Sequence, residues 1–513
     1  MPPQSESNAP IGPRHHFPAR RSSRPLILVA LSNLLVLTIY VWLISVGTWI
    51  HWPGHWSLYD ALATAFRHGQ LALMEKPDPA LVALPDPFNP ATRQGIPSPQ
   101  DISLYNGRFY SYFGPVPALI LAIVKFFVAG TIGDQYLVFA FSSGIFLLLS
   151  YMIVVIRRSF FADISDWALV PVILVGGLMN PFVWVVSTPS VYNAAITAGQ
   201  FFFLAGFCMS FAAVRKIPVS SWQLTLSGLL WVAALGSRIV LILPIAFMAV
   251  FIALTLALQA LRAGALAKSL PPMLALIGVL AIGLGELAWY NWARFGSITE
   301  TGFRYQLGGL FKQAHLGELF WPGYILQNLY NYLLNLPRVR YVFPYLTPVE
   351  GVTESIVAPI SLPIVYRAQQ MTGILYSSPL ITLALLPVIS ILLRHPGVLI
   401  KTNEKRWFKW LVIGLGGSFL AGAAFFIAFF WAAERYLIDF LPCLFLLSVI
   451  GLWQLDQYLV SKPRARALYW VALVGLIAFT ITVSILLSMN FNSDGFRRLN
   501  PILWRQLSNL FRP

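Results

Sequence analysis

The residues from 289 to 309 include the side chains best suited to chemistry in this sequence. An apolar run ends at Asn291, and a polar stretch rich in aromatic residues follows it, with an acid, Glu300, and a base, Arg304. If this stretch is helical, their spacing of four places both side chains on one face. We therefore predict that Asn291, Glu300, Arg304 and Tyr305 face a functional cavity. The alternative is a surface ion pair that contributes less than ~1 kcal/mol.

Two acids in the first long polar segment, residues 51–133, are candidates for general-base catalysis or cation binding. Asp60 and Asp101 could deprotonate an acceptor hydroxyl, or hold a divalent cation through their oxygen atoms. Asp60 also suits the first turn of an amphipathic helix, where a carboxylate favours the helix dipole. Asp101 precedes Asn106-Gly107, a strong turn signal, so a β-turn with aromatic anchors is the alternative reading there.

Charged residues also lie at the ends of apolar runs elsewhere. Arg238 and Arg435 could each bind a phosphate through the planar guanidinium group. Either could instead pair with Glu434 or extend its head to the membrane interface. Glu286 and Asp439 lie within apolar runs, where acids are costly and usually mark functional sites, although both are near the ends of their runs. We predict that Glu286 lines the same cavity.

Common cofactor and metal motifs are absent from the sequence. It has no P-loop, dinucleotide fingerprint, His-Glu-x-x-His or Cys-x-x-Cys. His51, His55 and His68 lack the spacing of metal ligands, so we assign no metal site. The two cysteines, Cys208 and Cys443, fall inside apolar runs and are predicted to be buried small hydrophobes rather than a disulfide.

The composition is that of a membrane protein. Of 513 residues, 58% are hydrophobic and only 11% are charged, whereas about 25% charged is usual for soluble domains. Apolar runs of roughly 20 residues recur along the chain, and each is long enough to cross a ~30 Å hydrocarbon core. The sequence predicts an all-α polytopic membrane protein with about eleven transmembrane helices and juxtamembrane helices in the first outer loop.

The net charge of +16 indicates how the chain is oriented in the membrane and does not indicate nucleic-acid binding. The basic residues are scattered over short loops between apolar runs, which is the pattern of cytoplasmic loops in membrane proteins. Residues 115–128 are apolar, but they are few and interrupted by Lys125. If they do not cross, every short basic loop falls on the cytoplasmic side. We therefore predict a cytoplasmic N-terminus, a periplasmic C-terminus and a non-crossing helix at 115–128.

The predicted spans divide the chain into seven parts. The spans are residues 26–50, 136–156, 167–186, 191–214, 222–237, 239–261, 270–291, 374–393, 410–433, 436–459 and 468–489. The parts are a disordered cytoplasmic tail (1–25), the first span (26–50), a first periplasmic loop with juxtamembrane helices (51–133), six spans (134–291), a second long periplasmic segment (292–372), four spans (373–489) and an interfacial tail (490–513). Both long segments are thus predicted to lie on one face.

Several short motifs resemble those of GT-C glycosyltransferases. The first-loop stretch Leu-Tyr-Asp-Ala-Leu-Ala-Thr-Ala-Phe-Arg-His-Gly-Gln-Leu-Ala-Leu at 58–73 is similar to theirs. So is the stretch at 101–117, with Tyr-Asn-Gly-Arg-Phe-Tyr and Phe-Gly-Pro-Val-Pro. Tyr-Asn-x-x-Arg-Phe-Gly-Ser from residue 290, and Arg-Tyr-Leu from residue 435 with Pro442, also resemble family segments. The nearest resemblance is to the bacterial protein-mannosyltransferase-like and aminoarabinose-transferase-like branch.

The resemblance implies a GT-C-like fold and a glycosyltransferase at the periplasmic face of a bacterial inner membrane. Its donor would be a polyprenyl-phosphate-linked sugar, and its acceptor a glycan, lipid or protein. Asp60 or Asp101 would be the base, with Arg304, Arg238 or Arg435 at the leaving phosphate. The alternatives are a lipid-glycan transporter or flippase with a similar cavity, or a catalytically degenerate relative, because Asp60 is shifted from the position of the family's first-loop acid.

Overall fold

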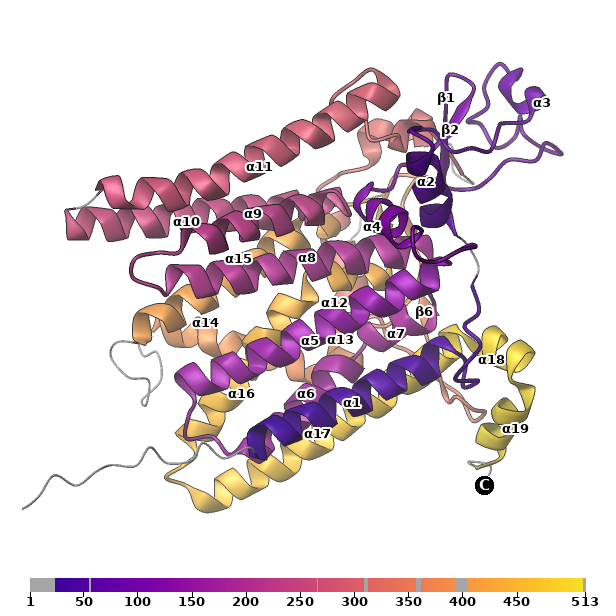
Figure 1. The fold of residues 1–513 in the computed structure, drawn as a ribbon. Helices are drawn as coiled ribbons and strands as arrows, with labels where there is room; N and C mark the ends of the chain where they lie inside the picture. The colour runs from indigo at the N-terminus through magenta and orange to yellow at the C-terminus, as the bar shows by residue number, and fades with distance from the viewer. Residues whose placement is uncertain are drawn as a thin grey trace, which may run out of the picture.

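The computed structural model describes residues 24–54, 57–264, 266–308, 312–356, 361–393 and 404–510. Long helices run side by side, and many of the short elements, including α2, α3, α4, α18, α19, β1 and β2, lie at one end of the bundle (Figure 1). The helices are α1 (Arg24–Ile44), α2 (Leu58–Arg67), α3 (Pro79–Val82), α4 (Val116–Val124), α5 (Asp134–Phe160), α6 (Leu169–Leu178), α7 (Phe182–Ser187), α8 (Val191–Val214), α9 (Ser221–Leu235), α10 (Ile242–Ala263), α11 (Leu266–Phe295), α12 (Tyr324–Leu334), α13 (Ile374–Ser377), α14 (Leu385–Leu392), α15 (Lys405–Ile427), α16 (Leu441–Tyr458), α17 (Pro463–Phe491), α18 (Ser493–Leu499) and α19 (Pro501–Leu510).

The remaining elements are short. The strands are β1 (Ile102–Tyr105), β2 (Arg108–Tyr110), β3 (Gln306–Leu307), β4 (Arg338–Val339), β5 (Leu346–Thr347), β6 (Val349–Glu350), β7 (Arg367–Ala368), β8 (Gln370–Met371) and β9 (Trp431–Ala432). The 3₁₀ turns are η1 (Asp166–Ala168), η2 (Ile239–Leu241), η3 (Phe303–Tyr305), η4 (Lys312–Glu318), η5 (Pro379–Ala384) and η6 (Glu434–Asp439). The fold is mostly helical, as predicted, but strictly all-α was wrong, because strands order the long loops.

Seven helices in the described part of the chain are long and apolar enough to cross a membrane. They are Pro25–Ile44, Asp134–Phe160, Val191–Val214, Ile239–Arg262, Ser269–Phe295, Lys405–Ile427 and Pro463–Phe491. A lipid core offers no hydrogen-bond partners, so a continuous helix is the form in which each can cross. Each overlaps a predicted span. The total of eleven stays a prediction, because the other four predicted spans are shorter or interrupted helices.

Two of those four are interrupted where proline prevents a continuous helix. The predicted span 167–186 is divided between η1/α6 and α7, with Pro181 at the junction, and 374–393 is divided among α13, η5 and α14, with Pro379 at the start of η5. Proline lacks the amide donor and clashes with the preceding turn. The backbone amide freed beside the first junction is satisfied, because Asn180 N donates to Ser484 Oγ at 2.8 Å.

The two ends of the bundle differ in character. The connections α5–α6, α8–α9, α10–α11 and α16–α17 lie at the left end in Figure 1, whereas α2, α3, α4, α18 and α19 lie at the right end. Four of the basic short loops predicted to share one side therefore lie at one end, and the fifth, from Arg394 to Lys409, lies mostly outside the described residues. Which end faces the cytoplasm stays a prediction. Helix α4 has nine residues, or ~14 Å of rise, less than half of a ~30 Å hydrocarbon core.

The two long polar segments are joined in one sheet. β1 pairs antiparallel with β2, and it also pairs with β3, so that Ile102 faces Leu307. Asn106 and Gly107 connect β1 to β2 with φ values of 47° and 68°, the left-handed geometry that tight hairpins require. The turn predicted at these residues is confirmed. The sheet brings the loop that begins at Asp101 against the stretch that follows α11.

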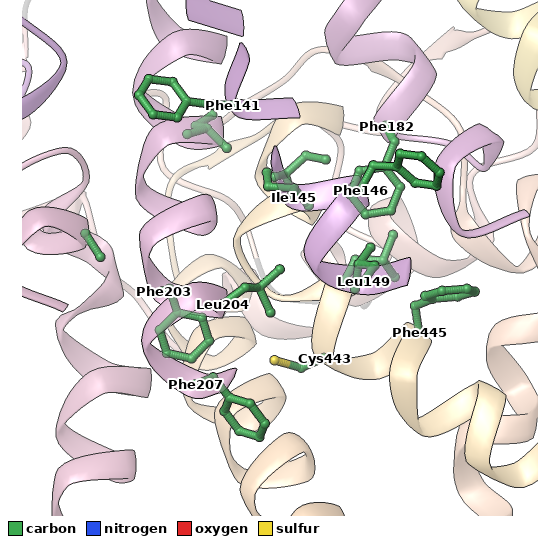
Figure 2. Close-up of a cluster of buried hydrophobic side chains, with 14 of the residues drawn as sticks. Phe141, Ile145, Phe146, Leu149, Phe182, Phe203, Leu204, Phe207, Cys443 and Phe445 are labelled. Carbon is green, nitrogen blue, oxygen red and sulfur yellow. The ribbon is translucent and has the colours of Figure 1, made fainter. Parts of the chain in front are cut away.

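The core lies between the long helices. Figure 2 shows aromatic and aliphatic side chains of α5, α7, α8 and α16 meeting at its centre, with Cys443 among them. Cys208 and Cys443 are both free and buried, so their prediction as small hydrophobes is confirmed. Aromatic rings such as Phe146 and Phe207 fill much of this volume, and between helices that cross a membrane such close van der Waals packing is what stabilises the bundle. This packing holds the helix ends that form the candidate site.

Candidate functional site

A cavity of about 370 Å³ lies near the end of the bundle that carries the sheet. Its walls are largely aromatic and aliphatic, and a few polar groups converge on it. The lining residues are Tyr112, Phe113, Gly114, Pro115, Tyr192, Ala195, Leu235, Ser237, Arg238, Ile239, Val240, Leu287, Tyr290, Asn291, Arg294, Thr301, Phe303, Leu319, Phe320, Phe425, Phe426, Phe429 and Tyr436. Apolar cavities with a few convergent polar groups are the usual form of ligand sites.

Arg238 enters this cavity from the turn between α9 and η2. Its Nε donates to both carboxylate oxygens of Asp439 at 3.1 Å, and its Nη2 donates to Asp439 Oδ2 at 2.9 Å. The Asp439 side chain is only 1% exposed and that of Arg238 15%. The pairing uses Nε and Nη2, and among the described residues no hydrogen bond engages Nη1. The guanidinium is therefore rigidly held and keeps a donor for a ligand.

Asp101 lies at the start of β1, in a strained backbone conformation with φ at 62°. Its Oδ2 accepts a hydrogen bond from the Tyr192 hydroxyl, and its Oδ1 accepts one from Gln306 Nε2. The three side chains come from the residue before β1, from α8 and from β3. Left-handed backbone in a residue other than glycine is uncommon and often accompanies function. The carboxylate is thus aimed at Tyr192, which lines the cavity.

Arg435 lies on the other side of Tyr192. Its guanidinium carbon is 4.8 Å from the Tyr192 ring centroid and 5.1 Å from that of Tyr436. The Arg238 guanidinium carbon is 5.3 Å from the same Tyr436 ring. Tyr436 therefore contacts both cations, and Tyr192 contacts both Asp101 and Arg435. Cation–π contacts of this kind orient guanidinium groups where water is scarce.

Two further polar groups border the cavity near the sheet. Arg294 is buried: its Nη1 donates to Ser111 O at 2.6 Å and its Nη2 to Asn291 Oδ1 at 2.9 Å. It also lies 3.8 Å from the Tyr290 ring centroid. Burial, followed by the nearby negative charge of Asp101 among smaller causes, raises the pKa of Tyr112 well above its usual value. Tyr112 therefore stays a neutral hydroxyl that can donate a hydrogen bond.

Four of the predicted site residues are brought together. Arg238 and Asn291 line the cavity, and Asp101 and Arg435 flank Tyr192 at its edge. They come from positions more than 300 residues apart in the chain, joined by the sheet and by the turn between α15 and α16. Asn291 is among the residues that line this cavity, and its functional role stays a prediction.

Asp60 lies elsewhere, within the helices of the first loop. Its Oδ1 accepts a hydrogen bond from Lys125 Nζ at 2.6 Å and another from the Ile132 amide at 3.0 Å. The side chains of Asp60 and Lys125 are 9% and 10% exposed. This buried pair fastens α2 to the end of α4. We therefore leave Asp60 out of the proposed site and assign it a structural role.

The positions of two other predicted residues, Glu286 and Glu300, are set by the backbone around them. Glu286 is exposed on α11, next to exposed apolar side chains such as Ile282 and Trp289, and it is not among the residues that line the cavity, so we leave it out of the proposed site. Glu300 Oε1 accepts from the Gly302 amide at 2.7 Å, because this stretch turns instead of forming a helix; the pairing expected of it with Arg304 does not form.

The last two predicted residues lie on η3. Arg304 is exposed there, and we leave it out of the proposed site. Tyr305 packs against Tyr105 and Phe295, with ring centroids 4.7 and 5.8 Å away, in an aromatic cluster beside the sheet. Gly296 and Gly302 both have positive φ, which explains how the chain turns twice between α11 and this cluster.

Sequence reasoning missed the residues that connect the others. Tyr192 and Tyr436 carry no motif of their own, and their role depends on contacts across the fold. Asp439 was noticed only as an acid in an apolar run; its partner is 201 residues away. Arg294 had a visible signal, since an arginine in the last turn of a membrane helix must find partners. In the described part of the chain, no group of three or more His, Cys, Asp or Glu side chains could hold a metal ion.

Comparisons with known proteins give distant structural likeness. No protein-family model matches the sequence, and no curated protein matches it. Solved structures similar to the chain include the crystal structure of the Archaeoglobus fulgidus oligosaccharyltransferase in the apo form, at 13% identity and a TM-score of 0.47. They also include the archaeal oligosaccharyltransferase AglB from Archaeoglobus fulgidus in complex with an inhibitory peptide and a dolichol-phosphate, at 12% identity and a TM-score of 0.45. Each likeness covers 91% of this chain and 56% of the other.

Proposed function

We propose that this chain is a GT-C-type glycosyltransferase that moves a sugar from a polyprenyl-phosphate donor to an acceptor hydroxyl. The observation that carries the proposal is the group formed by Asp101, Arg435 and Arg238 around two tyrosines at an aromatic cavity. An acid beside two guanidinium groups suits a reaction in which a hydroxyl loses a proton and a phosphate leaves. Catalysis would take place at the periplasmic face of a bacterial inner membrane.

The lining of the cavity suits an isoprenoid phosphate, which has an apolar tail and an anionic head. Phe425, Phe426 and Phe429 line the cavity together with Leu319 and Phe320, and the Phe320 ring packs on those of Phe425 and Phe429 with centroids 4.9 and 5.2 Å apart. These side chains offer an apolar surface to a prenyl tail, which would exchange its contacts with membrane lipid for van der Waals contacts with the aromatic rings. Arginine is the residue of choice for phosphate, because its donors form a planar fork. The tail would lie along the aromatic walls with its phosphate at Arg238 and Arg435.

In the proposed reaction, Asp101 is the general base. An acceptor hydroxyl gives its proton to the Asp101 carboxylate while its oxygen forms a bond to the anomeric carbon of the donor sugar. The bond from that carbon to the phosphate oxygen breaks, and its electron pair stays on the phosphate. Arg435 and Arg238 stabilise the charge that develops there. Hydrogen bonds from Tyr192 and Gln306 fix the direction of the carboxylate. Attack opposite the leaving group inverts the anomeric centre.

The test is donor turnover by purified full-length protein in lipid nanodiscs supplied with polyprenyl-phosphate sugars. Asp101→Asn should lower kcat by ~10²–10⁴-fold, the usual contribution of a general base. Arg435→Gln should lower it by ~10²–10³-fold through lost charge stabilisation. Arg108→Gln is the matched control, since Arg108 is exposed on the same sheet as Asp101, and it should turn over normally. Full activity of Asp101→Asn would refute the assignment.

The rival function is transport of the same lipid. A flippase would move a labelled polyprenyl-phosphate sugar across a liposome membrane and release no sugar. Translocation without turnover would therefore replace the proposal. The same turnover assay, run with and without chelator, measures the dependence on a divalent cation. Asp101 and the donor phosphate are the groups that would share such an ion through oxygen atoms.

A further inference from the structure

A second cleft, of about 580 Å³, adjoins the candidate site on the far side of Arg435. It lies between the start of α8, the short strands β6 to β9 and the end of α17, at the same end of the bundle as the sheet (Figure 1). Its lining residues are Trp184, Thr188, Ser190, Asn193, Glu350, Arg367, Ala368, Gln369, Gln370, Trp431, Arg435 and Phe491. The proposed reaction uses Arg435 and none of the others.

The cleft combines aromatic side chains with planar polar groups. Trp184 packs edge-on against Phe491, with ring centroids 5.3 Å apart, and Trp431 is a second tryptophan in the wall. Gln369 and Gln370 add two amides. The C–H faces of a sugar ring are apolar and pack against aromatic surfaces, whereas its hydroxyls both donate and accept hydrogen bonds. An aromatic body with a polar tip, as in tryptophan, matches both properties.

Four groups in this wall have unmet hydrogen-bonding capacity. Trp184 Nε1, Trp431 Nε1, Arg435 Nε and Asn193 Oδ1 have no partner among the described residues. Trp184 is 8% exposed and Asn193 1%, and polar groups buried this deeply are normally paired. Three are donors and one is an acceptor. These atoms are recessed, so a small rotation toward the cleft would meet a polyol, which supplies both kinds of partner.

Charge and backbone geometry exclude other ligands. The charged side chains in the lining are Glu350 and Arg367, which are exposed and opposite in sign, and Arg435, so the cleft has no large patch of either charge and suits a neutral ligand. An extended peptide would need a free row of strand backbone. The strands here are two residues long, and β6 already pairs with β8 and β7 with β9.

We infer that this cleft binds a sugar ring of the acceptor, which makes the acceptor a glycan. The inference rests on the proposed function only in naming that sugar as the acceptor. Arg435 joins the two sites: it contacts Tyr192 and Tyr436 on the donor side and lines the cleft on the other. An acceptor held there would present its hydroxyl to the group formed by Asp101 and Arg435.

Binding is tested with the full-length protein in nanodiscs, by saturation-transfer difference NMR with neutral methyl glycosides and disaccharides. A Ser/Thr-containing hexapeptide serves as the rival ligand. Trp184→Phe and Trp431→Phe keep the aromatic ring and remove the N–H donor, and each should weaken sugar binding roughly three- to tenfold. Glu350→Gln, at an exposed position, does not disturb the core; it replaces a charged acceptor for sugar hydroxyls by a neutral one and should weaken binding by a similar factor.

Trp167→Phe is the matched control. Trp167 is 71% exposed and belongs to η1, in the connection between α5 and α6 at the opposite end of the bundle, so this variant should bind sugar as the wild type does. Unchanged affinity in both cleft tryptophan variants, binding of the peptide alone, or no binding of any sugar would each overturn the inference. Donor turnover in the same preparations separates the two proposals. Turnover without sugar binding would refute only the assignment of the cleft, and sugar binding without turnover would refute only the proposed function.

Discussion

The ion pair between Arg238 and Asp439 gives the sharpest test of how the site is built. Three hydrogen bonds of 2.9 to 3.1 Å join the two side chains, and Asp439 is almost wholly enclosed. We consider Arg238→Met, Asp439→Leu and the double variant. Each single change strands a buried charge, whereas the double change removes both charges and leaves side chains of comparable size.

The expected magnitudes follow from that difference. Removing one partner of a buried pair typically costs about 3–5 kcal/mol of unfolding free energy, and replacing both by apolar residues is often close to neutral. The double variant should therefore be at least ~3 kcal/mol more stable than the sum of the two single effects predicts. Donor binding should fall in Arg238→Met and in the double variant alike, because both lack the guanidinium that faces the cavity.

Unfolding free energy in mixed micelles, followed by tryptophan fluorescence, gives the four corners of this cycle. The control cycle uses Arg466 and Asp456, which pair through two hydrogen bonds of 2.7 Å at the opposite end of the bundle. Asp456 is as buried as Asp439, but the Arg466 side chain is 35% exposed and Asp456 keeps a second donor in Trp470 Nε1, so the coupling should be smaller, and these variants should keep donor binding. Additive single effects at Arg238 and Asp439 would refute the view that their charges are mutually dependent.

Three further outcomes are expected. Burial raises the pKa of Glu434 to about 7, so between pH 4 and 7 the folded chain keeps a proton that the unfolded chain releases. The free energy of unfolding should therefore fall by about 3 kcal/mol between pH 4 and 7. Glu434→Gln should abolish this pH dependence in unfolding measurements. Lys125→Met should cost about 3–5 kcal/mol by stranding Asp60; an exposed-pair cost below ~1 kcal/mol would contradict its structural role. Gly114→Ala should destabilise by ~1–3 kcal/mol, because a Cβ there collides with the carbonyl oxygen of Gly236; unchanged melting would contradict it.

The helices were predictable from sequence because the membrane restricts the choices. A run of about 20 apolar residues must satisfy its own backbone, so the boundaries follow the polar flanks. The predicted span 191–214 coincides with α8. The helix interruptions at Pro181 and Pro379 could be predicted from the prolines, but the groups that satisfy the freed backbone could not. The backbone groups freed near Pro181 are satisfied by Ser484, which lies on a different helix.

The site was only half predictable, for a related reason. Arginines at the ends of apolar runs stand out, because a charge there needs a partner or a ligand. Which of the two it has depends on contacts that the sequence does not state. Arg238 forms an ion pair with Asp439, and Asp60 forms one with Lys125. Asp101 resembled a simple turn residue, yet it is the acid that the sheet delivers to Tyr192.

The two arginines of the site, Arg238 and Arg435, differ in the net positive charge that they offer to a ligand. Asp439 neutralises Arg238, so that residue offers a ligand a fixed donor but little net charge. Arg435 forms no ion pair among the described residues; its partners are the neutral Gln369 and the faces of two tyrosine rings. The ring of Tyr436 lies within cation–π distance of both guanidinium groups and adds no charge of its own, which limits the cost of placing them near each other. The uncompensated charge is thus at Arg435, where the donor cavity and the second cleft meet, and there a departing phosphate would gain most from it.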